Sequence, residues 1–214
     1  MKMKYVLIIA ASLVACFCFF FAKKTDTKKS VLLKDDATIV VGTSADYPPF
    51  AVVDSKTNEI VGFDIDIVVE VAKRLGKKIE IKDIPFAGLI FSLLYGDIAV
   101  VAAGMSPSER RAQTVSFSNQ YMQPDPFVII FKKSQADIKG LDDLIGKRVS
   151  VNSGYTAETY LSDRTDLDLV RLATPADSIL ALKSGAVDAY VCVQSVVNVM
   201  AVVHVPIEWI IFTI

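Results

Sequence analysis

The sequence has 214 residues, of which 52% are hydrophobic, and its 23 basic and 24 acidic side chains give a formal net charge of -1. This length and composition are enough for one compact domain or two small lobes and exclude a disordered tail. The charges are spread without a basic stripe, so nucleic acid is not expected as a partner. Cys16, Cys18 and Cys192 are not spaced as a ligand set and His204 is the single histidine, so we predict no disulfide framework, no metal and no cofactor.

The N-terminus has the organisation of an export signal. Residues 1–4 (MKMK) are positively charged, and residues 5–15 form an apolar stretch about as long as a signal-peptide core. The sequence LVAC, which ends at Cys16, resembles the bacterial lipobox and predicts a lipid on the Cys16 thiol. Because the apolar run continues to the end of residues 1–22, an uncleaved membrane anchor is the alternative. The polar, lysine-rich residues 23–37 then form a tether, and both alternatives leave the folded part outside the cytoplasm.

From residue 38 the chain alternates strand-like and helix-like patterns. Residues 38–43 (TIVVGT) predict a strand, and residues 65–75 have the apolar spacing of a helix. Asp64 is the predicted N-cap of that helix, and Gly76 is its left-handed stop. A strand, a helix and a strand are predicted next, at residues 78–83, 86–95 and 98–103. These repeated βαβ units indicate an α/β protein with a largely parallel sheet.

The same order of patterns recurs in the second half of the chain. Strand, helix, strand, helix and strand are predicted at residues 148–151, 156–161, 169–172, 176–183 and 187–193. We therefore predict two lobes, at residues 38–124 and 125–200. Residues 121–133 place two prolines ahead of an apolar strand, which is typical of a segment that crosses between lobes. The cleft is expected beside this segment.

The sequence SPSE at residues 106–109 predicts a helix start, with proline at the first helical position and a capping box from Ser106 to Glu109. Arg111 then falls in the second turn. Free N–H groups at a helix N-terminus and a guanidinium together suit a carboxylate. The alternative is a solvated pair of Arg110 and Arg111 on a short helix.

Aromatic and small polar residues follow several predicted strands. Tyr47 comes after the first strand, at the edge where open α/β sheets place their ligands, and Phe86 follows the next strand; both rings are either walls of a site or core. The loop at residues 152–156 could present free N–H groups to an anion. Asp64 and Asp66 are explained by helix capping and the helix dipole. No nucleophile, base and orienting group occur together, so an enzyme is not predicted.

Several segments in the same order resemble one family, the extracellular solute-binding proteins of family 3, which serve polar amino-acid ABC importers. The resemblance covers residues 38–191 and is strongest at residues 41–50, 61–67, 103–111 with 117–118, and 141–149. It implies a two-lobed fold of the type II periplasmic-binding-protein kind, whose lobes close on a ligand by a hinge. It also implies a monomer that is periplasmic or at the cell surface, with an amino acid and the importer's permease as partners.

The resemblance also assigns roles to individual residues. Tyr47 and Phe86 would enclose the ligand side chain between their rings, and Gly104 and Ser106 would hold its amino or carboxylate groups. Arg111 would clamp the α-carboxylate. From the second lobe, Ser153 and Thr156 would complete the carboxylate site.

Two departures from the family affect these expectations. Val193 stands where the family has an aspartate that pairs with the ligand's α-ammonium. Either Gln194 or an acidic residue elsewhere compensates, or the ligand is not an ordinary α-amino acid. The family also returns to its first lobe and adds C-terminal helices, whereas residues 201–214 supply only a candidate return strand, so the C-terminal part of lobe 1 is expected to be missing.

Two further functions stay open on the same scaffold. One is a periplasmic enzyme of the cyclic-acid dehydratase type, for which Glu109 and Asp46 are the candidate acids near Arg111. The other is a sensor or a degenerate remnant, which the shortened C-terminus favours.

Overall fold

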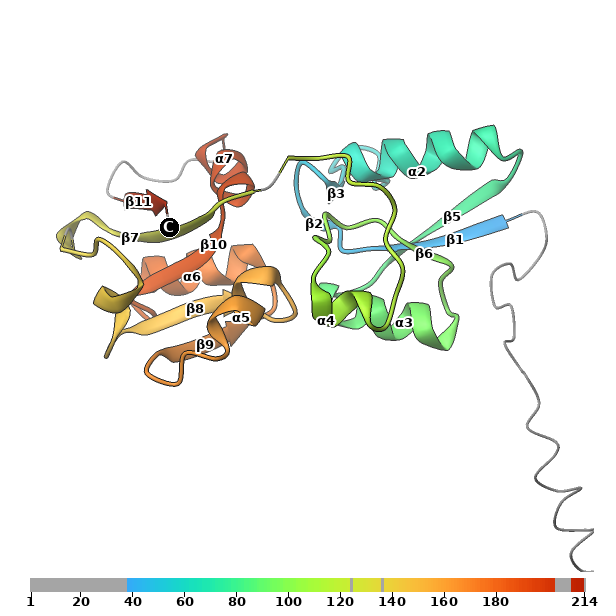
Figure 1. The fold of residues 1–214 in the computed structure, drawn as a ribbon. Helices are drawn as coiled ribbons and strands as arrows, with labels where there is room; N and C mark the ends of the chain where they lie inside the picture. The colour runs from blue at the N-terminus through green and yellow to red at the C-terminus, as the bar shows by residue number, and fades with distance from the viewer. Residues whose placement is uncertain (1–37, 124, 136, 203–208, 214) are drawn as a thin grey trace, which may run out of the picture. The chain divides into compact units, whose positions relative to one another are not determined.

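The computed structural model of the chain describes residues 38–123, 125–135, 137–202 and 209–213. The predicted export signal or anchor, the tether and Cys16 lie outside these residues, as does His204. Within the described ranges, the helices are too short or too polar to cross a membrane. The described chain forms two α/β lobes, each built around its own sheet, as predicted (Figure 1).

The sheet of the first lobe is entirely parallel and has the order β5-β1-β6. Its strands are β1 (Thr38–Thr43), β5 (Lys78–Asp83) and β6 (Val100–Val101), of which β1 and β5 have the predicted bounds and β6 is shorter. Helix α2 (Phe63–Arg74) lies on one face and α3 (Leu89–Tyr95) on the other (Figure 1). The helix predicted from residue 86 begins as the 3-10 turn η1 (Phe86–Gly88).

A small antiparallel sheet follows β1 and shapes the start of α2. Its strands are β2 (Asp46–Tyr47), β3 (Ala51–Val53) and β4 (Ile60–Val61). The carbonyl oxygens of Pro49 and Phe50 accept the N–H groups of Phe63 and Asp64 at 2.9 and 3.1 Å. These N–H groups at the start of α2 are therefore bonded to backbone carbonyls of the turn between β2 and β3 rather than to a side chain.

The prediction that Asp64 caps α2 is wrong. Gly62 is the N-cap, and its φ of 142° is a conformation that glycine adopts and other residues avoid. A Cβ at this position would lie 2.4 Å from the Phe50 carbonyl oxygen. Asp64 therefore lies inside the first turn, where its carboxylate is free to serve another part of the fold. The predicted stop at Gly76 is confirmed by its φ of 64°.

The sheet of the second lobe is mixed and has the order β11-β7-β10-β8-β9. Its strands are β7 (Phe127–Lys132), β8 (Arg148–Asn152), β9 (Asp168–Leu172), β10 (Ala189–Val193) and β11 (Trp209–Thr213). Its helices are α5 (Thr156–Leu161), α6 (Pro175–Ser184) and α7 (Gln194–Val202). The pairs β10–β8 and β8–β9 are parallel, whereas β7 runs antiparallel to β10 and to β11.

Alternate residues of the central strands pack on opposite faces of this sheet. On β7, Ile129 and Phe131 join the core under α5, whereas Val128 and Ile130 join a second core with α6 and α7. The second core also contains Tyr47 and Phe50 of the first lobe. The apolar run of β7 is therefore explained by burial on both faces, and one of those faces continues into the interface between the lobes.

The last strand differs from its prediction. We expected residues 201–214 to return toward the first lobe, but β11 pairs along β7 at the edge of the second sheet, with Ile211 opposite Ile130. The outer edge of β7 offers unpaired backbone groups, and β11 satisfies them.

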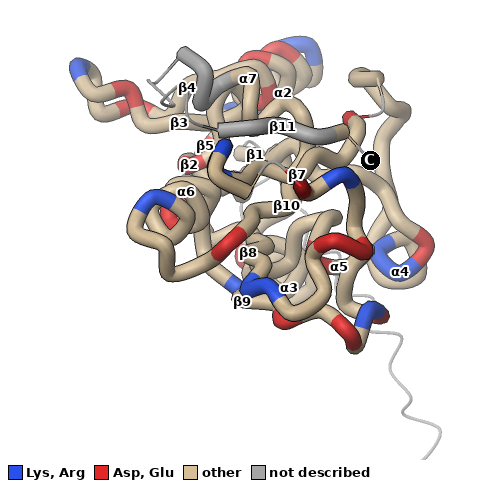
Figure 2. Tube along the Cα trace, turned by 90° about the vertical axis from the view of Figure 1, so that its left-hand side faces the viewer, with Lys and Arg blue, Asp and Glu red and all other residues tan. Residues whose placement is uncertain are grey.

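Charged residues of both signs are interspersed along the described part of the chain (Figure 2). The exposed ion pairs hold neighbouring segments together locally, as in the contact of 2.7 Å between Arg171 Nε and Glu158 Oε1.

Candidate functional site

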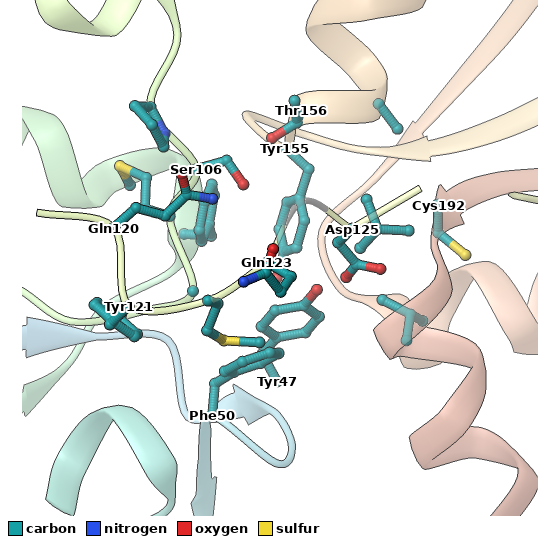
Figure 3. A pocket seen from close by; sticks show the side chains of 18 of the residues that line it. Tyr47, Phe50, Ser106, Gln120, Tyr121, Gln123, Asp125, Tyr155, Thr156 and Cys192 are labelled. Carbon is teal, nitrogen blue, oxygen red and sulfur yellow. The ribbon is translucent and has the colours of Figure 1, made fainter. Parts of the chain in front are cut away.

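A cavity of about 370 Å³ lies between the two lobes and receives side chains from both (Figure 3). Its wall includes residues 117–120 and, from the predicted crossing segment, residues 121–123 and Asp125, so the predicted place of the cleft is confirmed. Five of the seven predicted site residues line it: Tyr47, Phe86, Gly104, Ser106 and Thr156. Arg111 and Ser153 do not line it.

Tyr47 is the last residue of β2, which follows β1 along the chain, and it is buried in the wall of the cavity. Its ring stacks on Phe50, with centroids 5.0 Å apart, and its hydroxyl lies 3.2 Å from Ser195 Oγ of the second lobe. Burial raises the pKa of the Tyr47 phenol, so the hydroxyl stays protonated at neutral pH. Tyr47 therefore contributes both an aromatic wall and a polar contact between the lobes.

Arg111 lies on α4 (Glu109–Ala112), which starts later than predicted. Ser108, not Ser106, is the N-cap, and its hydroxyl accepts the Arg111 N–H at 3.3 Å. The Ser106 carbonyl instead accepts a hydrogen bond of 2.6 Å from Arg111 Nη1. The predicted capping box from Ser106 is wrong because the backbone of Ser106 is held by the guanidinium.

The Arg111 side chain is 8% exposed, so the solvated alternative is wrong as well. Its Nη2 donates to the Gly154 carbonyl of the second lobe at 2.7 Å, and its Cζ lies 5.6 Å from the centre of the Phe86 ring. Burial, with a smaller contribution from the charge of Arg110, lowers the pKa of Arg111. Among the described residues no carboxylate forms an ion pair with it, so this buried cation has only carbonyl acceptors.

Asp64 supports the cavity wall from behind. It is 1% exposed, and its carboxylate accepts the Gly104 N–H and the Tyr121 hydroxyl, the latter at 3.0 Å. Burial raises the pKa of Asp64, although these two hydrogen bonds act in the opposite direction. Because Gly104 and Tyr121 both line the cavity, Asp64 positions two parts of its wall. The helix-dipole explanation for Asp64 missed this role, since the partners lie 40 and 57 residues away along the chain.

Three N–H groups of the loop before α5, which we expected to be free, are engaged within the protein. The N–H groups of Ser153, Gly154 and Tyr155 donate to Leu172 O at 2.9 Å, Glu158 Oε2 at 2.7 Å and Asn152 O at 3.1 Å, respectively. The loop instead sends the Tyr155 side chain into the cavity (Figure 3). Sequence reasoning missed Tyr155 because a loop with the sequence NSGYT looks like an ordinary turn before a helix.

Asp125 is a second residue that sequence reasoning missed. It lines the cavity together with Val193, and its two carboxylate oxygens accept the Ser195 N–H at 3.2 and 3.3 Å (Figure 3). The register of β10 and β7 explains its position, because Val193 lies opposite Phe127, two residues after Asp125. Within the described part of the chain, no basic side chain comes within ion-pair distance of Asp125. A carboxylate between two prolines in the crossing segment was the available signal.

No group of three or more His, Cys, Asp or Glu side chains suited to a metal ion occurs among the described residues. Cys192 is buried. Glu109 is exposed, the Asp46 carboxylate accepts the Ser44 hydroxyl at 2.6 Å, and neither residue lines the cavity. The cavity thus combines aromatic walls, a carboxylate and a neighbouring guanidinium, which are groups that recognise a small zwitterion.

Comparisons with known proteins agree with this description. Residues 39–186 match the family of bacterial extracellular solute-binding proteins, family 3. The chain belongs to this family. The arginine-binding extracellular protein ArtP of Bacillus subtilis is 36% identical over 120 residues, which cover 56% of this chain and 46% of ArtP. The ABC transporter arginine-binding protein 1 of Escherichia coli is 32% identical over 158 residues, which cover 73% of this chain and 63% of that protein.

Among solved structures, holo ArgBP from T. maritima superimposes with a TM-score of 0.75 at 37% identity, covering 82% of this chain and 76% of that one. This similarity supports the two-lobed type II fold. The chain spans about half to two thirds of the length of the two relatives from B. subtilis and E. coli.

Proposed function

We propose that this chain is the extracytoplasmic substrate-binding component of an ABC importer and that it captures an amino acid between its two lobes. One observation carries the proposal: a cavity lined by both lobes has a buried guanidinium beside it and a carboxylate in its wall, and neither has a charged partner among the described residues. The names of the relatives, which bind arginine, support an amino acid as the ligand class. The importer's permease is the proposed partner, and the chain acts as a monomer.

Arg111 is the proposed clamp for the ligand's α-carboxylate. A guanidinium has five N–H donors, and two of those on Arg111 are engaged by the carbonyls of Ser106 and Gly154. The remaining donors can hold a carboxylate, while Gly104 and Ser106 line the adjoining wall. The Thr156 hydroxyl supplies a further contact from the second lobe, and Ser153 supports the loop that carries it.

Asp125 is the proposed partner for a positively charged group of the ligand. It takes the role for which Val193 has no suitable side chain, from the neighbouring strand segment. An amino acid would thus meet a positive group and a negative group from different parts of the site, which selects zwitterions over simple carboxylates.

We test this function by titration calorimetry of the full chain, in detergent micelles, against the twenty amino acids. At least one is expected to bind, with a stoichiometry of one. If no member of the panel gives a binding isotherm, the proposed function is wrong. Turnover of a cyclic acid, followed by chromatography of the products, would favour the enzyme alternative instead.

Replacing Asp125 with asparagine is expected to weaken binding of that amino acid by about 10- to 100-fold, because hydrogen bonds to charged groups contribute about 1.5–3 kcal/mol. Asp163→Asn is the matched control, since Asp163 is exposed, lies outside the cavity and loses the same charge. Calorimetry measures both dissociation constants. Equal dissociation constants for the two variants would contradict the role of Asp125.

We also propose that a lipid on Cys16 anchors the exported protein at the membrane. The lipobox-like sequence that ends at Cys16 supports this. Labelled palmitate is expected in the wild-type protein and absent from Cys16→Ser. Label that persists in the variant would refute lipidation at Cys16.

A further inference from the structure

Tyr155 is held in the interface between the lobes by its own loop. The preceding residue, Gly154, has a φ of 80°, and its Cα packs so closely on η1 that a Cβ there would lie 3.1 Å from the Ala87 Cα. The Gly154 carbonyl accepts Arg111 Nη2 of the first lobe, and its N–H donates to Glu158 of the second. The backbone at residue 154 is thus fixed from both lobes, and it directs Tyr155 inward.

The Tyr155 ring contacts both rings that the ligand was expected to lie between. Its centroid is 4.2 Å from that of Phe86, at an interplanar angle of 34°, and 5.7 Å from that of Tyr47, at 87°. At these separations no other flat group fits between Tyr155 and either neighbour. Phe86 is 7% exposed, so little of its surface is left for a ligand. We call the space bounded by Tyr47 and Phe86 the aromatic slot; Tyr155 occupies it.

The Tyr155 hydroxyl is poorly accommodated there. It is buried, and no described residue accepts or donates a hydrogen bond to it. Burial raises the pKa of the phenol, so the hydroxyl remains a protonated donor without an acceptor. A buried hydroxyl without a partner is unfavourable, whereas the packing of the ring is favourable. The Tyr155 side chain is therefore held in place by the packing of its ring and not by a polar contact of its hydroxyl.

We propose that Tyr155 is a specificity-determining residue, whose ring fills the aromatic slot and restricts the ligand to the rest of the cavity, beside Asp125. This inference rests on the proposed function. It predicts that a ligand with a long, flat side-chain end cannot stack between Tyr47 and Phe86 unless the Tyr155 ring leaves. A small amino acid is not affected by the ring, because it needs only the remaining cavity.

The experiment compares alanine with arginine as ligands of the full chain, by titration calorimetry. Tyr155→Thr empties the slot, and threonine suits the position because residue 155 is the N-cap of α5 and makes no side-chain cap in the wild type. The preference for arginine over alanine, given by the ratio of their dissociation constants, is expected to rise by about tenfold or more in Tyr155→Thr. Because Asp125 is present in both the wild type and Tyr155→Thr, any attraction of Asp125 for the arginine ligand cancels when their two preferences are compared.

Two further variants separate the slot from general effects on folding. Tyr155→Phe keeps a ring in the slot but removes the unpaired hydroxyl, so its melting temperature is expected to rise by about 2–4 °C without a gain in preference for arginine. Tyr95→Thr, on the exposed side of α3, is the control for loss of a tyrosine and is expected to leave both dissociation constants unchanged.

The outcomes distinguish this inference from the proposed function. If the wild type binds amino acids but Tyr155→Thr keeps the same preference, the role of Tyr155 is wrong and the function stands. If Tyr155→Phe gains arginine preference as Tyr155→Thr does, the hydroxyl and not the ring sets specificity, and the inference is overturned. If another amino acid binds the wild type while alanine and arginine do not, and Tyr155→Thr still does not bind arginine, emptying the slot has not admitted a long, flat side chain, and the inference is overturned. Binding of nothing overturns both.

Discussion

Arg111→Ala is expected to weaken amino-acid binding by about 30- to 4,000-fold, because truncating one partner of a buried, hydrogen-bonded charge pair costs about 2–5 kcal/mol. Arg111 is 8% exposed, and the two carbonyl acceptors of its guanidinium come from different lobes. Alanine would remove the proposed carboxylate clamp and one contact that holds the lobes together. Calorimetric titration with the amino acid that binds the wild type measures the effect.

Two variants control this experiment. Arg110→Ala removes the same charge from the next residue, which is exposed, and is expected to change the dissociation constant by less than about twofold. Arg111→Lys keeps the charge but loses the planar fork and is expected to restore only part of the affinity. If Arg111→Ala binds as well as Arg110→Ala, the guanidinium does not hold the ligand.

Local patterns predicted the fold better than they predicted the site. Strands β1 and β5 were predicted residue by residue. Strand β1 is a short apolar run that ends at turn residues, whereas β5 (KIEIKD) alternates charged and apolar residues. Helix α5 was also predicted with its observed bounds. The errors fall where a side-chain contact, rather than the local pattern, decides the structure. Ser106 looked like a helix cap, but its carbonyl is engaged by the Arg111 side chain.

The same limit applies to the two site residues that were missed. Tyr155 is separated from Phe86 by 69 positions in the sequence, and only the packing of Gly154 on Ala87 brings their rings together. In the sequence, Asp125 looks like part of a proline-rich crossing segment. The register of β7 and β10 brings it to Ser195, at the cavity that Val193 also lines. Spacing along the chain carries no information on either of these contacts. For Arg111 and Tyr47 the residue patterns left alternatives open, and the resemblance to the family assigned their roles.

Asp64→Ala is expected to lower the free energy of unfolding by about 1–3 kcal/mol, because it leaves the Gly104 N–H without its acceptor. The Tyr121 hydroxyl loses the same acceptor, but Tyr121 is half exposed and can donate to water instead. Denaturant unfolding of the wild type and the variant measures the difference. Ligand affinity is expected to fall as well, since Gly104 and Tyr121 form part of the cavity wall.

Asp66→Ala separates this role from the helix dipole. Asp66 lies in the same first turn of α2 but is exposed, so its replacement tests the dipole alone and is expected to cost about 0.3–1 kcal/mol. Equal losses of stability in the two variants would mean that Asp64 acts only through the helix dipole. The conclusion that its carboxylate stabilises the cavity wall would then be wrong.

The pH dependence of the unfolding free energy tests the role of Asp64 independently. The direction of the Asp64 pKa shift determines whether stability rises or falls with pH. Burial raises the pKa of Asp64 above its ordinary value of 3.8, so between these two pKa values the native state holds a proton that the unfolded state has lost. The contribution of Asp64 to stability therefore falls as the pH rises through this window and is constant above it. The difference in unfolding free energy between the wild type and Asp64→Ala is expected to shrink over the same window. A difference that instead grows with pH would indicate a lowered pKa, and with it a carboxylate stabilised by its two donors more strongly than burial opposes it.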